Sequence, residues 1–386
     1  MRTLTFNRVL GAGAMGTVYH AELRSPGGFV RTCAVKVMKA QPGPDHEQFM
    51  ARMRDEARLL GMLQDEQILG VSELVSIENR DAVVMEFVEG LDLAELIKEH
   101  RVPPRALCEL GAEMAGVLGR AHTAKHPTTG QALNVIHRDI KPANVMLTAR
   151  GNVRLLDFGV ARAAFSNRES QTQGLVLGTL NYFPPEVLVG AEPNQAVDIY
   201  GLGLTLWECA TGKEWGTPQA QQKRFERRVE QRLEELPADY QPLVPILKRI
   251  LQWEPQVRPT GAEVEKLLLA ASDRSKGEGL RTWARTMVTA LMASREKKVR
   301  GSRDELVGRT FEIGASAMTE DAKVTAPTSP AVPKPAPAPV VEARPVAKKR
   351  GGGGLFVVAG FGLVILTGAL VLGAVVVVVL AVVMLG

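Results

Sequence analysis

The sequence predicts an α+β fold with a β-rich first lobe and a helical second lobe, followed by a C-terminal transmembrane helix. Alternation of apolar and polar residues with short turns fills the first part of the chain, and longer helical patterns begin near Leu91. The run from Leu355 to Leu385 has no charged residue and exceeds the roughly 20 apolar residues that span a bilayer. These observations predict two lobes and a membrane span.

Composition narrows the classes of protein to consider. The chain of 386 residues has a formal net charge of +5, which is modest and not concentrated in one segment, so no nucleic-acid partner is expected. The three cysteines, Cys33, Cys108 and Cys209, form no CxxC or Cys/His pattern. They therefore favour a reducing cytosol over a disulfide framework or a zinc site. Residues 1–7 lack the basic start and apolar run of a secretory signal.

The first lobe is expected to begin with a strand, a tight turn and a second strand. Periodicity then predicts two further strands with one helix between them. In chain order these elements are the strand Arg8–Leu10, the turn Gly11–Gly16, the strands Thr17–His20 and Thr32–Met38, the helix Asp45–Leu63 and the strand Ala82–Phe87.

The turn has the spacing GxGxxGxV, with glycines at Gly11, Gly13 and Gly16. Glycines without side chains let backbone N–H groups approach phosphates closely. The same spacing marks dinucleotide-binding folds, but there a helix follows the glycines, whereas here a strand is expected. A hairpin that covers a nucleotide is therefore favoured, with Leu10 and Val18 in apolar contact with the base.

Lys36 lies in a strand with apolar neighbours, so its charge should point toward an anion or a carboxylate. In the following helix, Glu56 falls on the apolar stripe that should face the core. We expect these two residues to pair and to hold the lysine against the α- and β-phosphates of a nucleotide. Glu47 and Asp55 are alternative partners that lie off the stripe.

The segment His137–Asn144 and the later Asp157 supply a proton acceptor, a cation and two metal-binding side chains. Phosphoryl transfer needs an in-line hydroxyl, neutralised phosphate charge and Mg²⁺ held by oxygen ligands. Asp139, Lys141, Asn144 and Asp157 match these needs, so the segment indicates phosphoryl transfer.

The order glycine loop, AVK lysine, helix glutamate, HRDIKPAN and DFG resembles the eukaryotic-like, or Hanks-type, protein kinases over roughly residues 6–270. The resemblance implies the bilobal protein-kinase fold with ATP between the lobes. It also implies that Met85 is the gatekeeper and that the backbone from Glu86 to Val88 forms the hinge that contacts adenine.

The resemblance assigns roles to the catalytic side chains as well. Asp139 would be the catalytic base, and Lys141 would stabilise the charge on the transferred phosphoryl group. Asn144 and Asp157 would bind Mg²⁺, with Mn²⁺ as an alternative. Lys141 in its KPAN context resembles serine/threonine-specific members, while His137 would serve the scaffold.

The segment after the DFG motif resembles an activation segment. A phosphate on it would pair with Arg138 and order the segment. Ser170 and Thr172 are the preferred sites, and the choice between them is open. Thr179 is expected to contact the catalytic residues.

The second lobe carries further family features. Glu186, in Pro-Pro-Glu rather than the family's Ala-Pro-Glu, is expected to pair with Arg258. Asp198 and Gly203 match the helix whose aspartate braces the catalytic loop. The connection Thr123–Val135 is longer than in related chains and is expected to be a surface insertion.

Three segments are expected after the catalytic domain. Residues 271–321 contain a basic amphipathic helix, which either packs on the catalytic domain or binds a partner or a membrane surface. Residues 322–354 are a Pro/Ala-rich linker, and residues 355–385 are the transmembrane helix. The basic residues Lys348–Arg350 before the span predict a cytoplasmic catalytic domain.

Two other protein classes share parts of this pattern. A pseudokinase scaffold resembles kinases that have lost the lysine, the base or the DFG aspartate, and here Lys36, Asp139 and Asp157 are all present. A small-molecule phosphotransferase lacks the complete activation segment. The sequence therefore favours a membrane-tethered bacterial serine/threonine kinase that acts on protein substrates, with a homodimer for trans-autophosphorylation as a candidate assembly.

Overall fold

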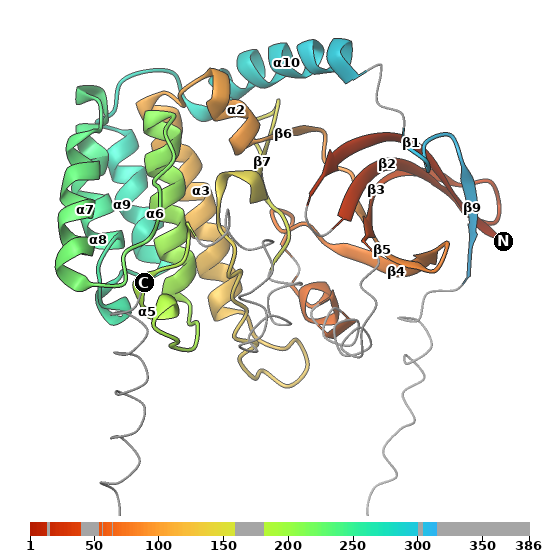
Figure 1. The fold of residues 1–386 in the computed structure, drawn as a ribbon, viewed down its shortest axis with the longest axis horizontal. Helices are drawn as coiled ribbons and strands as arrows, with labels where there is room; N and C mark the ends of the chain where they lie inside the picture. The colour runs from red at the N-terminus through yellow and green to blue at the C-terminus, as the bar shows by residue number, and fades with distance from the viewer. Residues whose placement is uncertain are drawn as a thin grey trace, which may run out of the picture. The chain divides into compact units, whose positions relative to one another are not determined.

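The computed structural model describes residues 1–13, 16–39, 54–55, 57–63, 65–158, 181–299 and 304–314. The chain divides into two compact units, Met1–Thr325 and Ala326–Gly386, and all described residues belong to the first. In that unit a small lobe of strands is followed by a large lobe of helices (Figure 1). The small lobe comprises residues 1–86 with 304–314, and the large lobe residues 90–299. The prediction of a β-rich lobe before a helical lobe is confirmed.

An antiparallel sheet of six strands forms the small lobe. The strands lie in the order β4 (Val71–Ile77), β5 (Arg80–Glu86), β3 (Val30–Met38), β2 (Gly16–Arg24), β1 (Arg2–Ala12) and β9 (Thr310–Ile313). Alternate residues such as Leu4 and Phe6 lie in the lobe's core, as the sequence periodicity predicts. The sheet curls until β9 contacts β4, and Arg2 of β1 pairs with the buried Glu73 of β4.

The strands predicted from periodicity are all present, and most are longer than predicted. Strands β4 and β9 were not predicted. β9 lies beside β1 although the two come from opposite ends of the described chain (Figure 1). Of the predicted helix Asp45–Leu63, residues 54–55 and 57–61 are helical, and residues 45–53 and 56 lie outside the described part.

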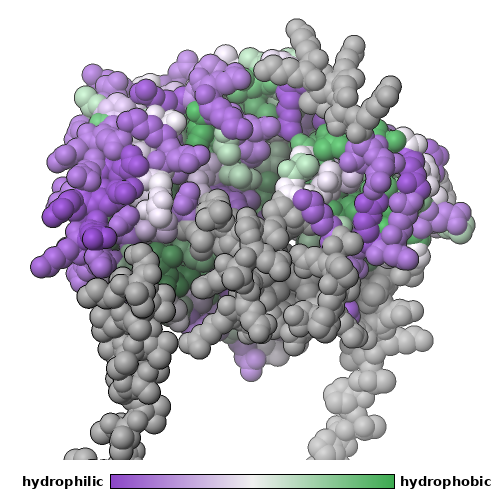
Figure 2. All heavy atoms as spheres, viewed as in Figure 1, coloured by the Kyte–Doolittle hydropathy of each residue, from purple (hydrophilic) through white to green (hydrophobic). Residues whose placement is uncertain are grey.

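The large lobe begins with a small sheet of β6 (Gly90–Asp92), β7 (Val145–Thr148) and β8 (Val153–Leu155). Its α-helices are α2 (Leu93–Glu99), α3 (Pro104–Thr123), α5 (Pro185–Leu188), α6 (Ala196–Thr211), α7 (Gln222–Glu234), α8 (Val244–Ile250), α9 (Gly261–Ser272) and α10 (Leu280–Val299). Short 3₁₀ turns are η1 (Pro142–Asn144), η4 (Ala238–Leu243) and η5 (Pro255–Val257). Hydrophilic side chains cover the left side of the view, where α7 lies (Figure 2).

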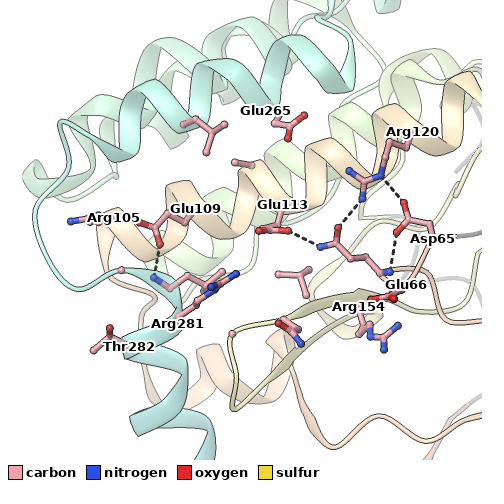
Figure 3. Close-up of a pocket in the computed structure, with 18 residues that line it drawn as sticks. Asp65, Glu66, Arg105, Glu109, Glu113, Arg120, Arg154, Glu265, Arg281 and Thr282 are labelled. Carbon is pink, nitrogen blue, oxygen red and sulfur yellow. Dashed lines mark hydrogen bonds and ion pairs between the residues drawn. The ribbon is translucent and has the colours of Figure 1, made fainter.

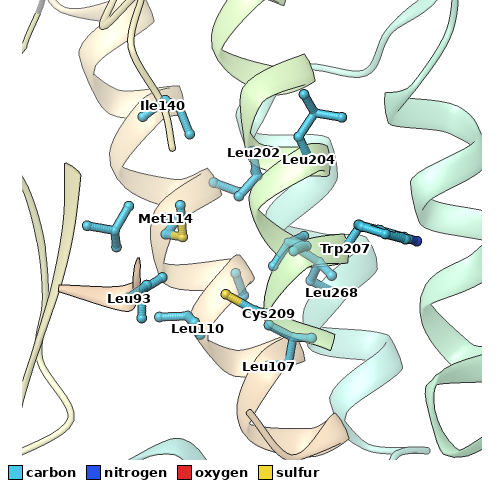
Figure 4. Close-up of a cluster of buried hydrophobic side chains, with 14 of the residues drawn as sticks. Leu93, Leu107, Leu110, Met114, Ile140, Leu202, Leu204, Trp207, Cys209 and Leu268 are labelled. Carbon is cyan, nitrogen blue, oxygen red and sulfur yellow. The ribbon is translucent and has the colours of Figure 1, made fainter. Parts of the chain in front are cut away.

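Helix α3 is the centre of the large-lobe core. Leu107, Leu110 and Met114 of α3 are fully buried, together with Leu202 and Trp207 of α6 (Figure 4). Small residues bring α3 close to α9: a Cβ on Gly261 would lie 2.6 Å from the backbone nitrogen of Gly119. Close helix packing thus fixes the framework under the catalytic loop.

Helix α10 packs on the large lobe. Leu280, Trp283, Ala284 and Val288 lie on one face at helical spacing and are buried in the large-lobe core. Of the two alternatives for the basic segment 271–321, the structure shows the packed helix over residues 280–299.

The structure describes the predicted insertion but not the predicted linker and membrane span. The insertion Thr123–Val135 forms a short, mainly exposed hairpin with one bridge between Lys125 and Ala132. Within the described ranges, no helix is long and apolar enough to cross a bilayer. The predicted linker 322–354 and span 355–385 lie outside those ranges.

Candidate active site

The catalytic loop gathers a lysine and an asparagine around the carboxylate of Asp139. Lys141 Nζ donates to Asp139 Oδ2 at 2.9 Å, and Asn144 Nδ2 donates to the same oxygen at 2.9 Å. Asn144 Nδ2 also lies 2.8 Å from the Asp139 backbone oxygen. These bonds fix the direction of the carboxylate, and the ammonium group brings positive charge beside it.

Asp198 of α6 holds the start of this loop. Its Oδ2 accepts from the backbone N–H of His137 at 2.8 Å, and its Oδ1 accepts from that of Arg138 at 2.7 Å. His122 Nε2 lies 2.8 Å from Oδ2 as well. Arg138 has a positive φ of 63°, so the backbone bends sharply just before Asp139. The bracing role expected for Asp198 is therefore visible in its contacts.

His137 belongs to the scaffold, as expected. Its side chain is fully buried, packs against Phe158 with ring centroids 4.4 Å apart and ring planes tilted by 42°, and accepts from the Asp139 backbone N–H at 3.3 Å. Burial lowers the pKa of His137, which outweighs the nearby carboxylates and favours the neutral ring.

A second ion pair joins the two lobes. Lys36 Nζ of β3 lies 2.7 Å from Asp157 Oδ2. Partial desolvation of the Asp157 carboxyl raises its pKa, but the charge and hydrogen bond of Lys36 outweigh this and hold the pKa below the ordinary value. Glu56, the predicted partner of Lys36, lies outside the described residues.

The side chains predicted to contact the base gather in one small apolar cluster. Met85, which is 7% exposed, lies in this cluster with Ala34, and the half-buried Leu10 and Val18 pack against them. The register that pairs Val18 with Lys36 places the cluster beside the ion pair with Asp157. We define these residues with Leu74 and Val83 as the adenine cluster, because an apolar surface next to a cation suits a nucleotide.

The glycine turn is a tight hairpin between β1 and β2. Gly13 N–H donates to the Gly16 oxygen at 2.8 Å, and Gly11 pairs with Val18 across the strands. A Cβ on Gly16 would lie 2.2 Å from the Val37 oxygen, so only glycine permits this approach to β3. Gly11 and Gly13 are exposed, and residues 14 and 15 lie outside the described part.

The predicted hinge follows β5. Glu86 is exposed and pairs with Arg154 of β8 at 3.1 Å, while Val88 is half-buried. Phe87 packs edge-on against His20, with ring centroids 4.7 Å apart. Its neighbours thus hold the connection between the lobes from both sides.

A backbone hydrogen bond joins the segments that carry Asn144 and Asp157, the two residues predicted to bind Mg²⁺. The backbone N–H of Leu156 donates to the Asn144 oxygen at 2.9 Å, which ties the two segments together. The Asn144 amide nitrogen is used by Asp139, so its Oδ1 is left as an acceptor, and the Asp157 side chain is 47% exposed. Among the described residues no cluster of three or more His, Cys, Asp or Glu could hold a metal alone. Two oxygen ligands supplemented by phosphate and water fit Mg²⁺, which seldom has an all-protein cage.

The chain after the predicted activation segment is fastened to the large lobe. Arg258, whose side chain is fully buried, donates to both oxygens of Glu186, at 2.6 and 2.8 Å. Tyr182 donates to Glu208 of α6 at 2.6 Å. The expected Glu186/Arg258 pair is therefore present. Ser170, Thr172 and Thr179 lie outside the described residues.

Comparison with known proteins gives the family of this architecture. The family described as protein kinase domain matches residues 4–269, which is most of the chain. This chain belongs to the protein kinase family.

Bacterial protein kinases are among the relatives of this chain. A probable serine/threonine-protein kinase of Bifidobacterium longum, pknA2, is 36% identical over 209 residues, covering 53% of this chain and 26% of that protein. The serine/threonine-protein kinase PknD of Mycobacterium tuberculosis is 37% identical over 207 residues, covering 53% of this chain and 29% of that protein. The matches thus cover about a quarter to a third of the length of these curated relatives. The crystal structure of the Mycobacterium tuberculosis PknI kinase domain is 26% identical with a TM-score of 0.53, covering 69% of this chain and 96% of that chain.

A cavity of about 640 Å³ is lined mainly by large-lobe residues, together with Asp65–Gln67, and none of the catalytic residues lines it (Figure 3). Five carboxylates and four arginines line it, and none of the residues predicted to bind nucleotide does. Arg120 already pairs with Asp65 at 2.7 Å, and Arg105 with Glu109 at 3.0 Å. Because carboxylates outnumber arginines in its lining and two of the arginines are already paired, this cavity does not suit a triphosphate.

Sequence reasoning missed Ala34, Leu74 and Val83 of the adenine cluster, and it missed Arg154 beside the hinge. Ala34 belongs to the adenine cluster, and it lies on the same face of β3 as Lys36 because alternate strand residues share a face. The alternation of strand residues could therefore have predicted that Ala34 lies on the same face of the strand as Lys36. Arg154, which pairs with Glu86 across 68 residues of sequence, carried no local signal.

Proposed function

We propose that this protein is a serine/threonine protein kinase that transfers the γ-phosphate of ATP to hydroxyl groups of protein substrates. The observation that carries the proposal is the convergence of Lys141 and Asn144 on one oxygen of Asp139, with Lys36 and Asp157 joined between the lobes. This arrangement contains a base, a stabilising cation and a nucleotide clamp. The names of pknA2 and PknD support serine/threonine specificity, whereas a Myxococcus xanthus relative that is 34% identical over 209 residues is named a tyrosine-protein kinase.

Each residue of the site has a separate role in the proposed reaction. Asp139 accepts the proton of the substrate hydroxyl as the new O–P bond forms, and the O–P bond to ADP breaks. Lys141, 2.9 Å from Asp139, offsets negative charge on the transferred group. Lys36 positions the α- and β-phosphates, and the adenine cluster binds the base. Asn144 and Asp157 would hold Mg²⁺, which supplies charge neutralisation on the phosphates when bound.

Regulation by loop phosphorylation is part of the proposal. Arg138 precedes the base, and its backbone N–H is fixed by Asp198. A phosphate on Ser170 or Thr172 that pairs with its guanidinium would order the activation segment next to Asp139, with Thr179 contacting the catalytic residues. Autophosphorylation in trans within a homodimer is the simplest source of that phosphate.

We further propose that residues 355–385 anchor the protein in the cell membrane, with the kinase domain in the cytoplasm. The support is the length of the uncharged run and the basic residues Lys348–Arg350 before it. Deletion of residues 355–386 should move the protein from the carbonate-resistant membrane fraction to the soluble fraction. A full chain recovered in the soluble fraction would contradict the anchor.

The decisive experiment for the activity uses the full chain purified in detergent micelles. Incubated with γ-labelled ATP, Mg²⁺ or Mn²⁺ and a generic protein substrate, it should transfer label to serine and threonine. Lys36→Met and Asp139→Asn are the controls and should not transfer. No transfer by the wild type, to itself or to the substrate, would favour a pseudokinase scaffold, and label on tyrosine alone would contradict the specificity.

A further inference from the structure

An extension made of residues 280–299 and 304–314 lies beyond the kinase family match, which ends at residue 269, and has one part in each lobe. Its first part, α10, is buried against the large lobe through Leu280, Trp283, Ala284 and Val288. Its last part, β9, is an edge strand of the small-lobe sheet. We define residues 280–299 and 304–314 as the strap.

The strap holds the start of β1, the strand that leads into the glycine turn. Strand β9 pairs with β1 from Arg2 to Thr5. The Phe6 N–H donates to the Arg309 oxygen at 3.0 Å, and the Gly308 N–H donates to the Phe6 oxygen at 2.7 Å. Leu306 is fully buried in the small-lobe core, so this part of the strap is integrated into the lobe.

The strap also reaches the other end of β1 through one side chain. Arg295 Nη2 of α10 donates to the backbone oxygen of Leu10 at 2.7 Å. Arg295 Nη1 donates to Glu95 Oε2 of α2 at 2.9 Å. One planar guanidinium therefore bridges a large-lobe carboxylate and the backbone directly before Gly11.

The bonded carbonyl belongs to a residue of the nucleotide site. The Leu10 side chain packs on the adenine cluster, and Gly11, the next residue, begins the glycine turn. Strand β9 holds the start of β1, and Arg295 holds its other end, so both contacts limit how far the glycine turn can move relative to the large lobe. One face of α10 packs into the large-lobe core, which fixes the helix that carries Arg295.

We infer that Arg295 is a positioning residue for ATP binding, which acts by holding the Leu10 backbone rather than by touching the nucleotide. This inference rests on the proposed kinase function. It predicts that loss of Arg295 weakens nucleotide binding and leaves the chemical step in the large lobe intact. Lysine should not replace it, because a single ammonium on a flexible stem cannot reproduce the planar fork to both acceptors.

The test compares Arg295→Ala and Arg295→Lys with wild type in the full chain. A hydrogen bond to a charged group contributes a few kcal/mol when buried, and partial exposure reduces this, so Kd for a fluorescent ATP analogue and KM for ATP should rise about threefold to tenfold. The value of kcat should stay within about twofold, since Asp139 and Lys141 are not disturbed. Arg285→Ala, an exposed arginine on the same helix, is the matched control and should leave Kd unchanged.

A second variant separates positioning from folding. Glu95→Gln keeps an acceptor for Arg295 but removes its charge, so Kd should rise by less than in Arg295→Ala while the thermal midpoint stays near that of wild type. An unchanged Kd in Arg295→Ala, or a fall in kcat at unchanged Kd, would overturn the inference while the kinase proposal stands. If the wild type binds the analogue but transfers no phosphate, the proposed kinase function is wrong while the role of Arg295 in nucleotide binding stands. If the wild type binds no nucleotide, both the proposed kinase function and the role of Arg295 are wrong.

Discussion

Replacement of Glu186 should destabilise the protein strongly, because it leaves a buried cation without its partner. The Arg258 side chain is fully buried and donates to both oxygens of Glu186. Three backbone carbonyls, those of Ala196, Gln252 and Trp253, accept its other bonds but carry no neutralising charge. Removing one partner of such a buried pair costs about 3–5 kcal/mol.

Thermal unfolding of the full chain measures this loss. For a domain of this size each kcal/mol lowers Tm by roughly 2 °C, so Glu186→Ala should lower Tm by roughly 6–10 °C. Glu186→Gln keeps one acceptor oxygen and should lose about 1–3 kcal/mol. Glu192→Ala, an exposed carboxylate nearby, should change stability by less than about 0.5 kcal/mol. If Glu186→Ala unfolds within a degree or two of the Glu192→Ala control, the pair does not anchor the segment as argued.

Two further predictions concern the small lobe and its junction with the large lobe. Gly16→Ala should lower stability by about 1–3 kcal/mol in denaturant unfolding, because its Cβ would lie 2.2 Å from the Val37 oxygen, whereas Gly11→Ala, with nothing within 4 Å, should unfold like wild type. Equal stability of the two variants would refute the close approach. Lys36→Met removes the charge that, against desolvation, lowers the pKa of Asp157. This pair stabilises the folded state at pH values above the ordinary Asp pKa of 3.8. The stabilisation is lost as the pH falls through the lowered pKa that Asp157 has in the folded state. The difference in unfolding free energy between wild type and Lys36→Met should therefore be largest near neutral pH and shrink in acid; a difference that does not shrink would contradict the pairing.

The catalytic contacts were largely predictable because their residues lie in motifs. Asp139, Lys141 and Asn144 are within six positions of one another, so a short loop brings them together. The pairing of Glu186 with Arg258 spans 72 residues, and only the resemblance to a known family made it predictable.

In the strap, the helix α10 was predicted from its amphipathic spacing, but β9 and the contact of Arg295 with Leu10 were not. β9 has four residues, which is too short for alternation to be distinguished from chance, and its partner β1 lies about 300 residues earlier. Arg295 lies in a helix whose many basic residues are typical of a solvated face. Its contact with Leu10 depends on how α10 packs, which is a tertiary property. Glu73 was missed for a related reason, since a carboxylate is rarely expected in a buried strand position.

The central claim is that Asp139 acts as the base of a phosphoryl transfer to protein hydroxyls. The most direct measurement is the single-turnover rate of γ-phosphate transfer by the full chain, wild type against Asp139→Asn, with ATP affinity measured in parallel. General-base catalysis contributes about 10²–10⁴ in rate, so the variant should bind ATP like wild type and transfer phosphate slower by about that factor. Transfer by Asp139→Asn at the wild-type rate, with unchanged affinity, would contradict the assignment.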